Sequence, residues 1–384
     1  MASEWKQMPI IECIELIGGG TPKTSIAEYW NGDIPWLSVK DFNDDFRYVY
    51  TTEKSITEAG LNNSSTKLLQ KDDIIISARG TVGEMAMIPF PMAFNQSCYG
   101  IRAKDGINST FLYYLLKNSI SKLKQMTHGS VFDTITRSTF EMLIVGVPNK
   151  KTQDIIANIL AAIDNKIELN NRINDNLQQQ AMALYASMFL DNPALETTAG
   201  TLKDIADITM GQSPSGSSYN EDGNGEVFYQ GRAEFGYRFP TRRLYTTEPK
   251  RMAEAGDVLL SVRAPVGDLN VAYERCCIGR GLGAIHGRNG YQSFVLYTMF
   301  ALRPQLDAYN GEGTVFGSIN RNALNDMPID IPSEDAIAAF EAVVRPMDAM
   351  IRSNYEENCR LQELRDSLLP RLMSGEVDVS DIDI

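Results

Sequence analysis

Two polar stretches of the chain carry side chains suited to hydrogen-bonding with the edges of nucleic-acid bases. The run FYQGRAEFGYRFPTRR at 228–243 interleaves arginine with aromatic residues, and SVKDFNDDFRY at 38–48 is similarly polar. Arginine can form two hydrogen bonds with guanine, and glutamine can do the same with adenine. Each of these side chains could instead be an ordinary solvated loop residue. The candidate base readers are Lys40, Asp41, Asn43, Arg47, Gln230, Arg232, Glu234 and Arg238, and the candidate phosphate contacts are Lys67, Arg242 and Arg243.

No pattern in the chain predicts catalysis. His128 and His286 are the only histidines, which is too few for a typical zinc site or for a Ser/His/Asp arrangement. The five cysteines are odd in number and show no C-x-x-C spacing, so we expect reduced, mostly buried thiols. A G-x-x-x-x-G-K-[ST] phosphate loop and the Asn/Asp-Pro-Pro-Tyr/Phe motif of amino-methyltransferases are also absent. We therefore expect no enzyme activity, metal site or cofactor in this chain itself.

The charge of the chain is unevenly distributed. A net charge of −13 argues at first against nucleic acid, because DNA-binding proteins usually carry a basic surface. Residues 1–150 and 200–332 are nearly neutral, with 15 basic and 16 acidic groups in the first and 13 and 15 in the second. The acidic excess lies in residues 151–199 and 333–384, with 3 basic and 6 acidic groups and with 5 and 12. No segment is apolar enough to span a membrane, and the start does not resemble a signal peptide, so we expect a cytoplasmic protein.

The chain contains an internal repeat. GSVFDTITR at 129–137 matches GTVFGSINR at 313–321, and ISARGTVGE at 76–84 matches LSVRAPVGD at 260–268, both with an offset of 184 positions. Nearer the start, IGGGTPKT at 17–24 matches TMGQSPSG at 209–216 with an offset of 192. Two copies at so long a period indicate a duplicated domain and not a solenoid.

Residues that are identical in the two copies should have the same role, and residues that differ should have different roles. Arg79 and Arg263 are equivalent, as are Arg137 and Arg321. We expect these arginines to support the fold, with phosphate contacts as the less favoured alternative. The candidate base readers named above lie where the copies differ.

Each copy ends in a segment with a coiled-coil pattern. Apolar residues alternate spacings of four and three from Ile156 to Met188 and again from Phe340 to Leu372, although we expect Pro346 and Pro370 to bend or interrupt the second helix. Both seams have two asparagines at the centre. An antiparallel pairing of residues whose numbers sum to 528 joins Asn170 with Asn358, Asn174 with Asn354, Ile167 with Leu361, Leu177 with Ile351, and Ala181 with Met347. The alternative is that each helix packs on its own domain.

The predicted fold class is α+β, with two similar β-rich domains separated by two long antiparallel helices related by a pseudo-twofold axis. A helix of about 38 residues would be about 55 Å long and would hold the domains apart. The predicted boundaries are 1–150 for the first β-rich domain, 151–190 for the first helix, 191–200 for a linker, 201–332 for the second domain, 333–376 for the second helix and 377–384 for an acidic tail.

These features together resemble one known family. GGGTPKTSIAEYWNGDIPWLSVKDF at 18–42, GQSPSGSSYNEDGNGEVFYQGRAEF at 211–235, the repeated G-[ST]-V-F segments and LLPRLMSGEV at 368–377 are similar to the specificity subunits of type I restriction-modification systems. The resemblance covers nearly the whole chain and follows the family's order of two target-recognition domains, each followed by a helix.

The resemblance implies a non-catalytic subunit that reads double-stranded DNA. Each domain would read one half of a bipartite target, and the helices would set the spacing of the halves. Two methyltransferase subunits carrying S-adenosylmethionine would dock on it, and restriction subunits that use ATP and Mg²⁺ would join them. From the residues alone, a duplicated scaffold that binds only proteins remains the alternative.

Overall fold

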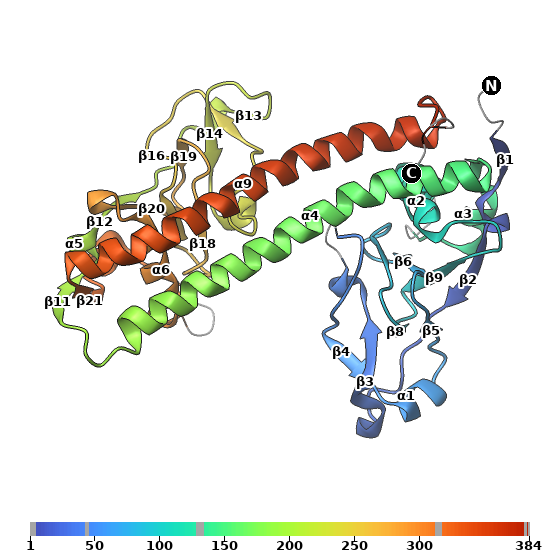
Figure 1. Ribbon diagram of the computed structural model, residues 1–384, viewed down its shortest axis with the longest axis horizontal. Coiled ribbons are helices and arrows are strands. Elements are labelled where there is room, and N and C mark those ends of the chain that lie inside the picture. Colours follow the sequence, from blue (N-terminus) through green and yellow to red (C-terminus); the bar gives the residue numbers. More distant parts are fainter. Residues whose placement is uncertain (1–4, 43–45, 128–133, 312–316, 380–381, 383–384) are drawn as a thin grey trace. The chain divides into compact units, whose positions relative to one another are not determined.

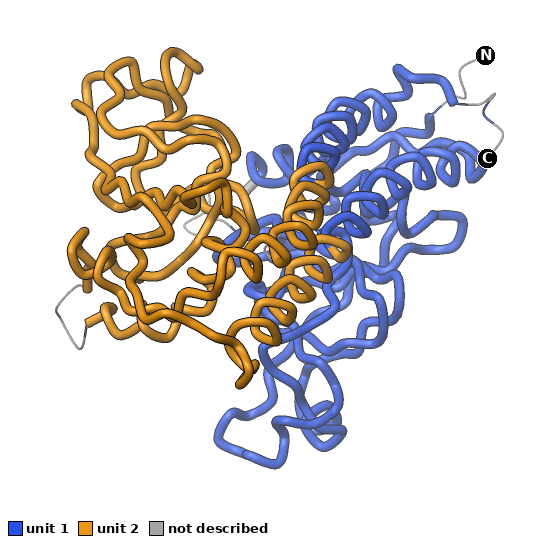
Figure 2. The backbone as a smooth tube through the Cα atoms, turned by 60° about the vertical axis from the view of Figure 1, so that its left-hand side comes forward, with its two compact units in different colours: residues 1–171, 355–384 blue, residues 172–354 orange. Residues whose placement is uncertain are grey.

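The computed structural model describes residues 5–42, 46–127, 134–311, 317–379 and 382. The chain divides into two compact units, and each combines part of both long helices with one β-rich region (Figure 2). The first unit comprises 1–171 with 355–384, and the second comprises 172–354. The predicted α+β class is confirmed.

The two long helices are α4, Lys150–Tyr185, and α9, Glu334–Met373 (Figure 1). A five-residue π-helical segment, Ala186–Leu190, extends α4. The expectation that Pro346 and Pro370 interrupt the second helix is wrong, because α9 is continuous through both. Burial of Val344 and Ile351 on either side of Pro346 stabilises the helix there, which offsets the backbone hydrogen bond that proline removes.

The described residues of the first unit form three sheets. A four-stranded antiparallel sheet has the order β2-β9-β6-β7, and a second sheet has the order β4-β3-β8-β5, in which β3 and β8 are parallel. The strands are β1 Lys6–Pro9, β2 Ile14–Gly18, β3 Trp30–Leu37, β4 Lys54–Ile56, β5 Leu68–Leu69, β6 Ile74–Ser77, β7 Met85–Met87, β8 Met92–Phe94, β9 Cys98–Ala103 and β10 Ile144–Val147, where β1 pairs with β10. The short helices are α1 Glu58–Asn62, α2 Ser109–Thr127 and α3 Arg137–Met142.

The second unit repeats this organisation. Its sheets have the orders β12-β20-β17-β18 and β13-β15-β14-β19-β16, with β14 and β19 parallel as β3 and β8 are. The strands are β11 Thr197–Thr201, β12 Ala206–Met210, β13 Tyr219–Asn220, β14 Glu226–Tyr229, β15 Tyr245–Thr246, β16 Met252–Ala253, β17 Val258–Ser261, β18 Leu269–Val271, β19 Cys276–Ile278, β20 Leu282–Gly287 and β21 Pro328–Pro332. The helices are α5 Leu202–Ile205, α6 Gln292–Ala301, α7 Arg303–Asp307 and α8 Arg321–Asn325. The segment 191–200, expected to be a linker, ends in β11, which pairs with β21.

Each part of a long helix packs into the core of its own unit. In the first unit, Ile156 and Leu160 of α4 are fully buried and cluster with Ile74 and Phe111. In the second unit, Ala181 of α4 and Phe340 of α9 are fully buried in the cluster that contains Leu260. A fully buried side chain of this kind contributes about 1.5–3 kcal/mol relative to an exposed one, so burial of an apolar face decides where each helix packs.

The helices are antiparallel in both units, and the asparagines face each other. Asn170 donates a 2.9 Å hydrogen bond to Asn358, and Asn354 donates a 2.8 Å bond to Asn174. Asn170 also donates to Glu357. These are the two asparagine pairs that the sum of 528 predicts. The hydrogen bonds offset the free-energy cost of burying the four amides, because each amide meets another polar group.

Candidate nucleic-acid interface

The clearest shared structure in the two units is one strand-to-strand turn. We define the arginine turn as residues 77–84 in the first unit and 261–268 in the second. Gly83 donates its N–H to the carbonyl of Ser77 at 3.0 Å, and Gly267 donates to Ser261 at the same distance. Positive φ angles of 92° at Gly83 and 101° at Gly267 require glycine in both turns.

The repeated segment near the start of each copy packs beside this turn. A Cβ on Gly19 would lie 2.1 Å from the carbonyl oxygen of Asn95, and a Cβ on Gly211 would lie 2.1 Å from that of Gly279. Only glycine permits so close an approach between backbones. This contact explains why both copies have glycine there.

The third repeated segment is also fixed to the turn. Ile135 donates its N–H to the carbonyl of Ala78 at 3.0 Å, and Ile319 donates to Val262 at 3.0 Å. Residues 128–133 and 312–316, which include both G-[ST]-V-F segments, lie outside the described residues. Three sequence repeats that are far apart in the chain therefore meet at the arginine turn in each unit.

In the first unit, the predicted base readers Lys40 and Asp41 lie next to this turn. Both line a pocket of about 440 Å³ together with Arg79, Lys54 and Asn95. Lys40 is exposed. Asp41 accepts hydrogen bonds from the Ser38 N–H and hydroxyl at 2.7 and 2.9 Å and from the Glu53 N–H at 2.7 Å. Asp41 thus holds its own loop together, and Asn43 lies outside the described residues.

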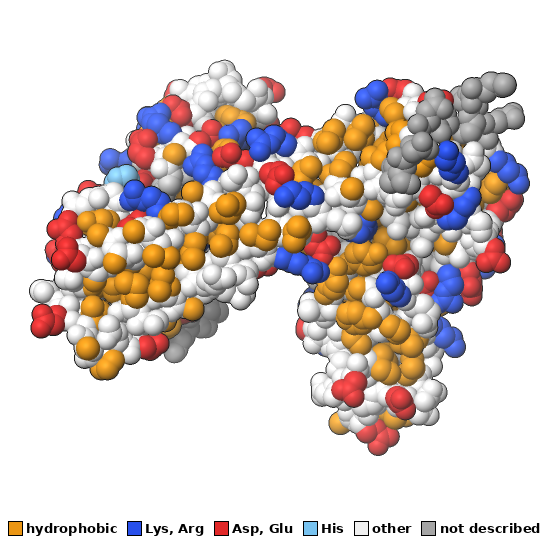
Figure 3. Space-filling view, in the orientation of Figure 1, with side chains coloured by type: hydrophobic (Ala, Val, Ile, Leu, Met, Phe, Trp, Pro, Cys, Tyr) orange, Lys and Arg blue, Asp and Glu red, His pale blue; other side chains and the backbone are white. Residues whose placement is uncertain are grey.

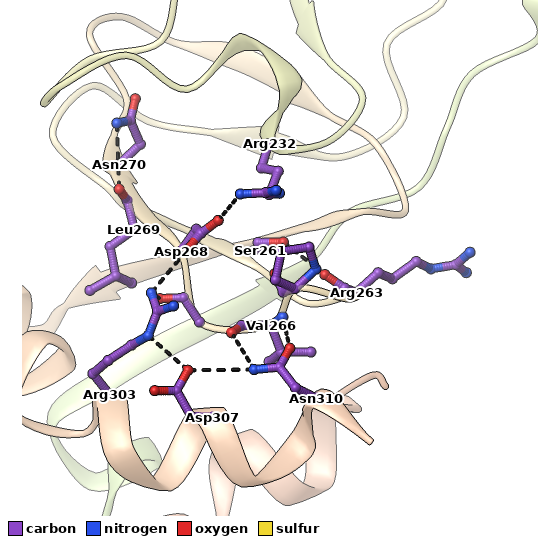
Figure 4. Close-up of polar contacts among 12 residues, drawn as sticks. Arg232, Ser261, Arg263, Val266, Asp268, Leu269, Asn270, Arg303, Asp307 and Asn310 are labelled. Carbon is purple, nitrogen blue, oxygen red and sulfur yellow. Dashed lines mark hydrogen bonds and ion pairs between the residues drawn. The ribbon is translucent and has the colours of Figure 1, made fainter. Parts of the chain in front are cut away.

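In the second unit, Gln230 and Arg232 occupy the corresponding place. The backbone carbonyl of Gln230 accepts from Gly281, whose own carbonyl accepts from Val262 in the arginine turn. Arg232 forms an ion pair with Asp268 of the turn, and Arg303 of α7 contacts the same carboxylate at 3.0 Å (Figure 4). Together with Phe235 and Phe300 these three residues line a pocket of about 560 Å³.

Three of the predicted base readers are buried, which revises their role. Arg47 is 8% exposed and donates to Asn165 of α4 at 2.5 Å. Arg238 is 5% exposed and forms an ion pair with Asp348 of α9. Glu234 is 7% exposed and accepts from Arg243 at 2.5 Å. A buried side chain cannot reach the edge of a base, so in this structure these residues contribute to the fold, although Arg47 Nε and Glu234 Oε2 lack a hydrogen-bond partner among the described residues.

The predicted phosphate contacts are on the surface. Lys67, Arg242 and Arg243 are all exposed. Arg242 forms an ion pair with Glu274 and stacks on Tyr273 with 5.5 Å from its guanidinium carbon to the ring centre. Exposed ion pairs of this kind contribute only about 0–1 kcal/mol, so Arg242 is available to a stronger anionic partner. Arg243 is paired with the buried carboxylate of Glu234.

Two buried networks join the long helices to α2 and α6, and the sequence did not reveal them. Tyr114 of α2 donates to Asp164 of α4 at 2.5 Å, and Tyr297 of α6 donates to Asp348 of α9 at 3.1 Å. Burial, with the neighbouring carboxylate, raises the pKa of both tyrosines, so the phenols stay protonated and act as donors. The offset of 184 between Asp164 and Asp348 was the available signal, although a repeated aspartate on a helix does not identify its partner.

Two of the buried cysteines have raised pKa values. Burial raises the pKa of Cys98 and of Cys276 to about 12, so both are unreactive thiols at neutral pH. Within the described ranges, no three His, Cys, Asp or Glu side chains gather as metal ligands would. None of the described helices is long and apolar enough to cross a membrane.

Comparison with known proteins identifies the family. The family model described as type I restriction modification DNA specificity domain matches residues 2–179. A type I restriction enzyme specificity subunit, MjaIX, of Methanocaldococcus jannaschii is 24% identical over 99% of this chain and 95% of its own length. The putative MjaX specificity subunit of the same organism is 30% identical over 72% of this chain and 70% of its own length.

A solved structure shows the same fold. The type I restriction-modification S subunit from M. genitalium matches 97% of this chain and 96% of its own length with a TM-score of 0.61, at 16% identity. The repeated turns, the paired helices and the sequence relatives agree. The chain belongs to the family of specificity subunits of type I restriction-modification systems.

Proposed function

We propose that this chain is the non-catalytic DNA-recognition subunit of a type I restriction-modification complex, in which each unit reads one half of a bipartite target. One observation carries the proposal: the two arginine turns share the positive-φ glycine and the hydrogen bond that closes the turn, but have different exposed side chains beside them. Phosphates are the same at any site, whereas bases differ between half-sites. Shared turns with divergent neighbours are what two different half-sites require.

The residues that we propose as base readers are fewer than the sequence offered. They are Lys40 in the first unit and Gln230 and Arg232 in the second, all exposed beside an arginine turn. Arg232 would exchange its exposed ion pair with Asp268 for a base edge. That exchange costs little, because an exposed pair contributes about 0–1 kcal/mol and a bidentate contact to guanine about 1–3 kcal/mol. Lys67, Arg242 and Arg243 remain the proposed phosphate contacts.

The long helices carry the proposed docking surface for partner subunits. Exposed apolar side chains lie along both helices: Leu169, Ile173 and Met182 on α4, and Val343, Met350 and Leu364 on α9. We propose that two methyltransferase subunits dock there with S-adenosylmethionine, that restriction subunits add ATP- and Mg²⁺-dependent cleavage, and that the helices fix the spacing of the half-sites. The complex would act in the cytoplasm, where its DNA substrate is.

The acidic net charge of the chain is consistent with a complex in which this chain reads the sequence and its partners contribute to DNA affinity. On the face drawn in Figure 3, Lys and Arg side chains are interspersed with Asp and Glu over both units. Affinity for DNA depends strongly on basic groups that neutralise phosphates. The partners would therefore supply much of the affinity, and this chain would supply the sequence preference.

The test is methylation sequencing in a host that expresses this chain with its companion subunits. In the assembled complex, Lys40→Ala should relax one half of the target, and Arg232→Ala the other half, each by about 1–3 kcal/mol of discrimination. Arg288→Ala is the matched control, since Arg288 is exposed and paired with Asp207 at the opposite end of β20 from the turn, about 20 Å away.

The scaffold alternative makes a different prediction. Exchanging residues 1–150 for those of a relative should change one half of the target. A target that stays unchanged after the exchange, in a complex that still assembles and methylates, would refute sequence reading by this region and support the scaffold.

A further inference from the structure

The arginine turns present one exposed arginine each. Arg79 and Arg263 are equivalent in the repeat, and both are exposed. Among the residues that the structure describes, neither guanidinium has a hydrogen-bond or ion-pair partner. Figure 4 shows Arg263 extending away from the cluster formed by Arg232, Asp268 and Arg303. In the second unit Arg232 and Arg303 are thus paired with Asp268, while the guanidinium of Arg263 has no partner within the described part of the chain.

The sequence favoured fold support for these arginines, and the structure does not bear that out. The backbone of the turn is held without their side chains. Ser261 donates its hydroxyl to the carbonyls of Arg263 and Pro265 at 2.9 and 3.0 Å, and Asn310 bonds both the N–H and the carbonyl of Val266. In the first unit, Glu84 donates its N–H to the Ser77 hydroxyl at 2.8 Å.

We propose that Arg79 and Arg263 each bind a phosphate of the DNA backbone, one in each half-site, and so hold each unit in place while its neighbours read bases. This inference rests on the proposed function. An arginine kept at the same place in both copies is suited to a group that is the same in both half-sites. The DNA backbone meets that condition and the base edges do not.

The surroundings of both arginines suit an anion. In the first unit, Lys40 and Lys54 line the same pocket as Arg79. Asp41, an acidic group of that pocket, already accepts three hydrogen bonds, and Glu53 is the remaining carboxylate there. In the second unit, Val262 bonds the carbonyl of Gly281, which places exposed Arg280 beside the turn. A flat guanidinium is well shaped to donate two hydrogen bonds to a phosphate.

The turn is also rigid enough to position a contact. In both units it is tied to the third repeated segment and to the residue just before strand β9 or β20: Ala78 donates its N–H to Ser97, and Val262 donates its N–H to Gly281, at 2.8 and 3.0 Å. An arginine on a loop fixed at several points loses little backbone entropy when it binds, so its contact fixes the register of the whole unit.

The experiment measures DNA binding by the assembled methyltransferase complex as a function of salt. Fluorescence anisotropy is recorded with a cognate duplex, duplexes altered in either half-site, and an unrelated duplex. Each phosphate contact contributes about 0.9 to the slope of log K against log salt. Arg79→Gln and Arg263→Gln should each lower the slope by about 1, and the double variant by about 2, with an equal loss of affinity on every duplex. Arg79→Lys should keep most of the slope, and Arg288→Gln should leave it unchanged.

Four other outcomes would overturn the inference. Weaker binding to the cognate duplex alone would make these arginines base readers, which leaves the proposed function intact. Failure of the variant chain to assemble with its partners, with the salt slope unchanged in what does assemble, would make them protein contacts. A lower unfolding midpoint of the chain would assign them to the fold. A parent complex without preference for any duplex would instead refute the proposed function itself.

Discussion

The two units attach their β-rich regions to the long helices through similar buried networks with different charge pairs. In the first unit, Asp164 of α4 accepts from Tyr114 and forms an ion pair with Arg365 of α9 at 3.0 Å. In the second, Asp348 of α9 accepts from Tyr297 and forms an ion pair with Arg238, which comes from the β-rich region. The aspartate and a tyrosine recur, but the arginine comes from a different part of the fold.

The reason lies at one position of the helices. Residue 365 is arginine, and the equivalent position in the first helix, 184 positions earlier, is Ala181. The second unit has no arginine at this position, and a buried carboxylate without a cation is costly. In the second unit Arg238 supplies the cation that pairs with Asp348. In the first unit Asp164 is already paired with Arg365, and Arg47 donates to the neutral Asn165. The comparison shows that both units keep a buried aspartate paired with an arginine, but that the arginine comes from a different element in each unit.

The largest effect should come from removing the aspartates. Asp348→Ala leaves the buried Arg238 with two neutral neighbours, Gln178 at 3.0 Å and the ring of Tyr297, and should cost about 3–5 kcal/mol. Asp164→Ala should cost less, because Arg365 keeps Asp366 at 2.9 Å. Urea unfolding with hydrogen exchange read separately in α2 and α6 measures both losses.

A double variant is the control for the charge argument. Arg238→Met with Asp348→Leu should restore most of the stability, since removing both partners of a buried pair is often neutral. An equal loss in Asp164→Ala and Asp348→Ala would contradict the comparison.

The shared part of the structure should respond equally in both units. Gly19→Ala and Gly211→Ala each place a methyl group 2.1 Å from a carbonyl oxygen, and should destabilise their units by about 1–3 kcal/mol to a similar extent. Gly18→Ala, with nothing within 4 Å of the added carbon, should be nearly neutral. Thermal unfolding of the three variants tests this, and a loss in one unit alone would show that the turns are not equivalent.

The asparagine layers should respond unequally. Asn354→Ala removes the bond to Asn174 and should cost about 1 kcal/mol. Asn358→Ala should cost more, because Asn358 accepts from Asn170 at 2.9 Å and also donates to Asn171 at 2.8 Å. Chemical denaturation measures both, and the reverse order would mean that Glu357, which still accepts from Asn170 at 2.8 Å, compensates for the loss.

The smallest effect concerns the caps of α2 and α6. Gln153 accepts from Asn108 at 2.9 Å just before α2, and Glu341 accepts from Phe294 at 2.8 Å in the first turn of α6. Burial raises the pKa of Glu341, so this group binds its proton more tightly in the folded state and its contribution to stability falls as the pH rises through the raised pKa. Glu341→Gln should gain stability over the parent as the pH rises from 4 to about 7, by less than about 1 kcal/mol. If the difference in stability between Glu341→Gln and the parent did not change with pH, Glu341 would not be the group that binds the proton.

Much of the fold could be predicted because its signals are local or periodic. The alternation of four and three spacings indicated α4 and α9, and the repeats at an offset of 184 indicated two related β-rich regions. The asparagine pairs followed from the same periodicity, because a buried amide in a seam needs another polar group opposite it.

The candidate site was predicted less well. Arg47 and Arg232 are both arginines in polar loops, yet the first is buried against α4 and the second is exposed at the arginine turn. Nothing in their neighbours along the chain separates them, because burial depends on which helix packs over the loop. The same is true of Arg79 and Arg263, because only the folded surface shows that their guanidinium groups have no partner among the described residues.

The sequence by itself determined the duplicated plan, the seam of the helices and the glycines of the turns, since these depend on spacing and on backbone conformation. Only the tertiary structure decided which charged side chains form ion pairs in the interior and which remain on the surface. The physical reason is that pairing of charges is set by distances across the fold between residues about 50 to 200 positions apart, such as Arg238 with Asp348 and Asp164 with Arg365.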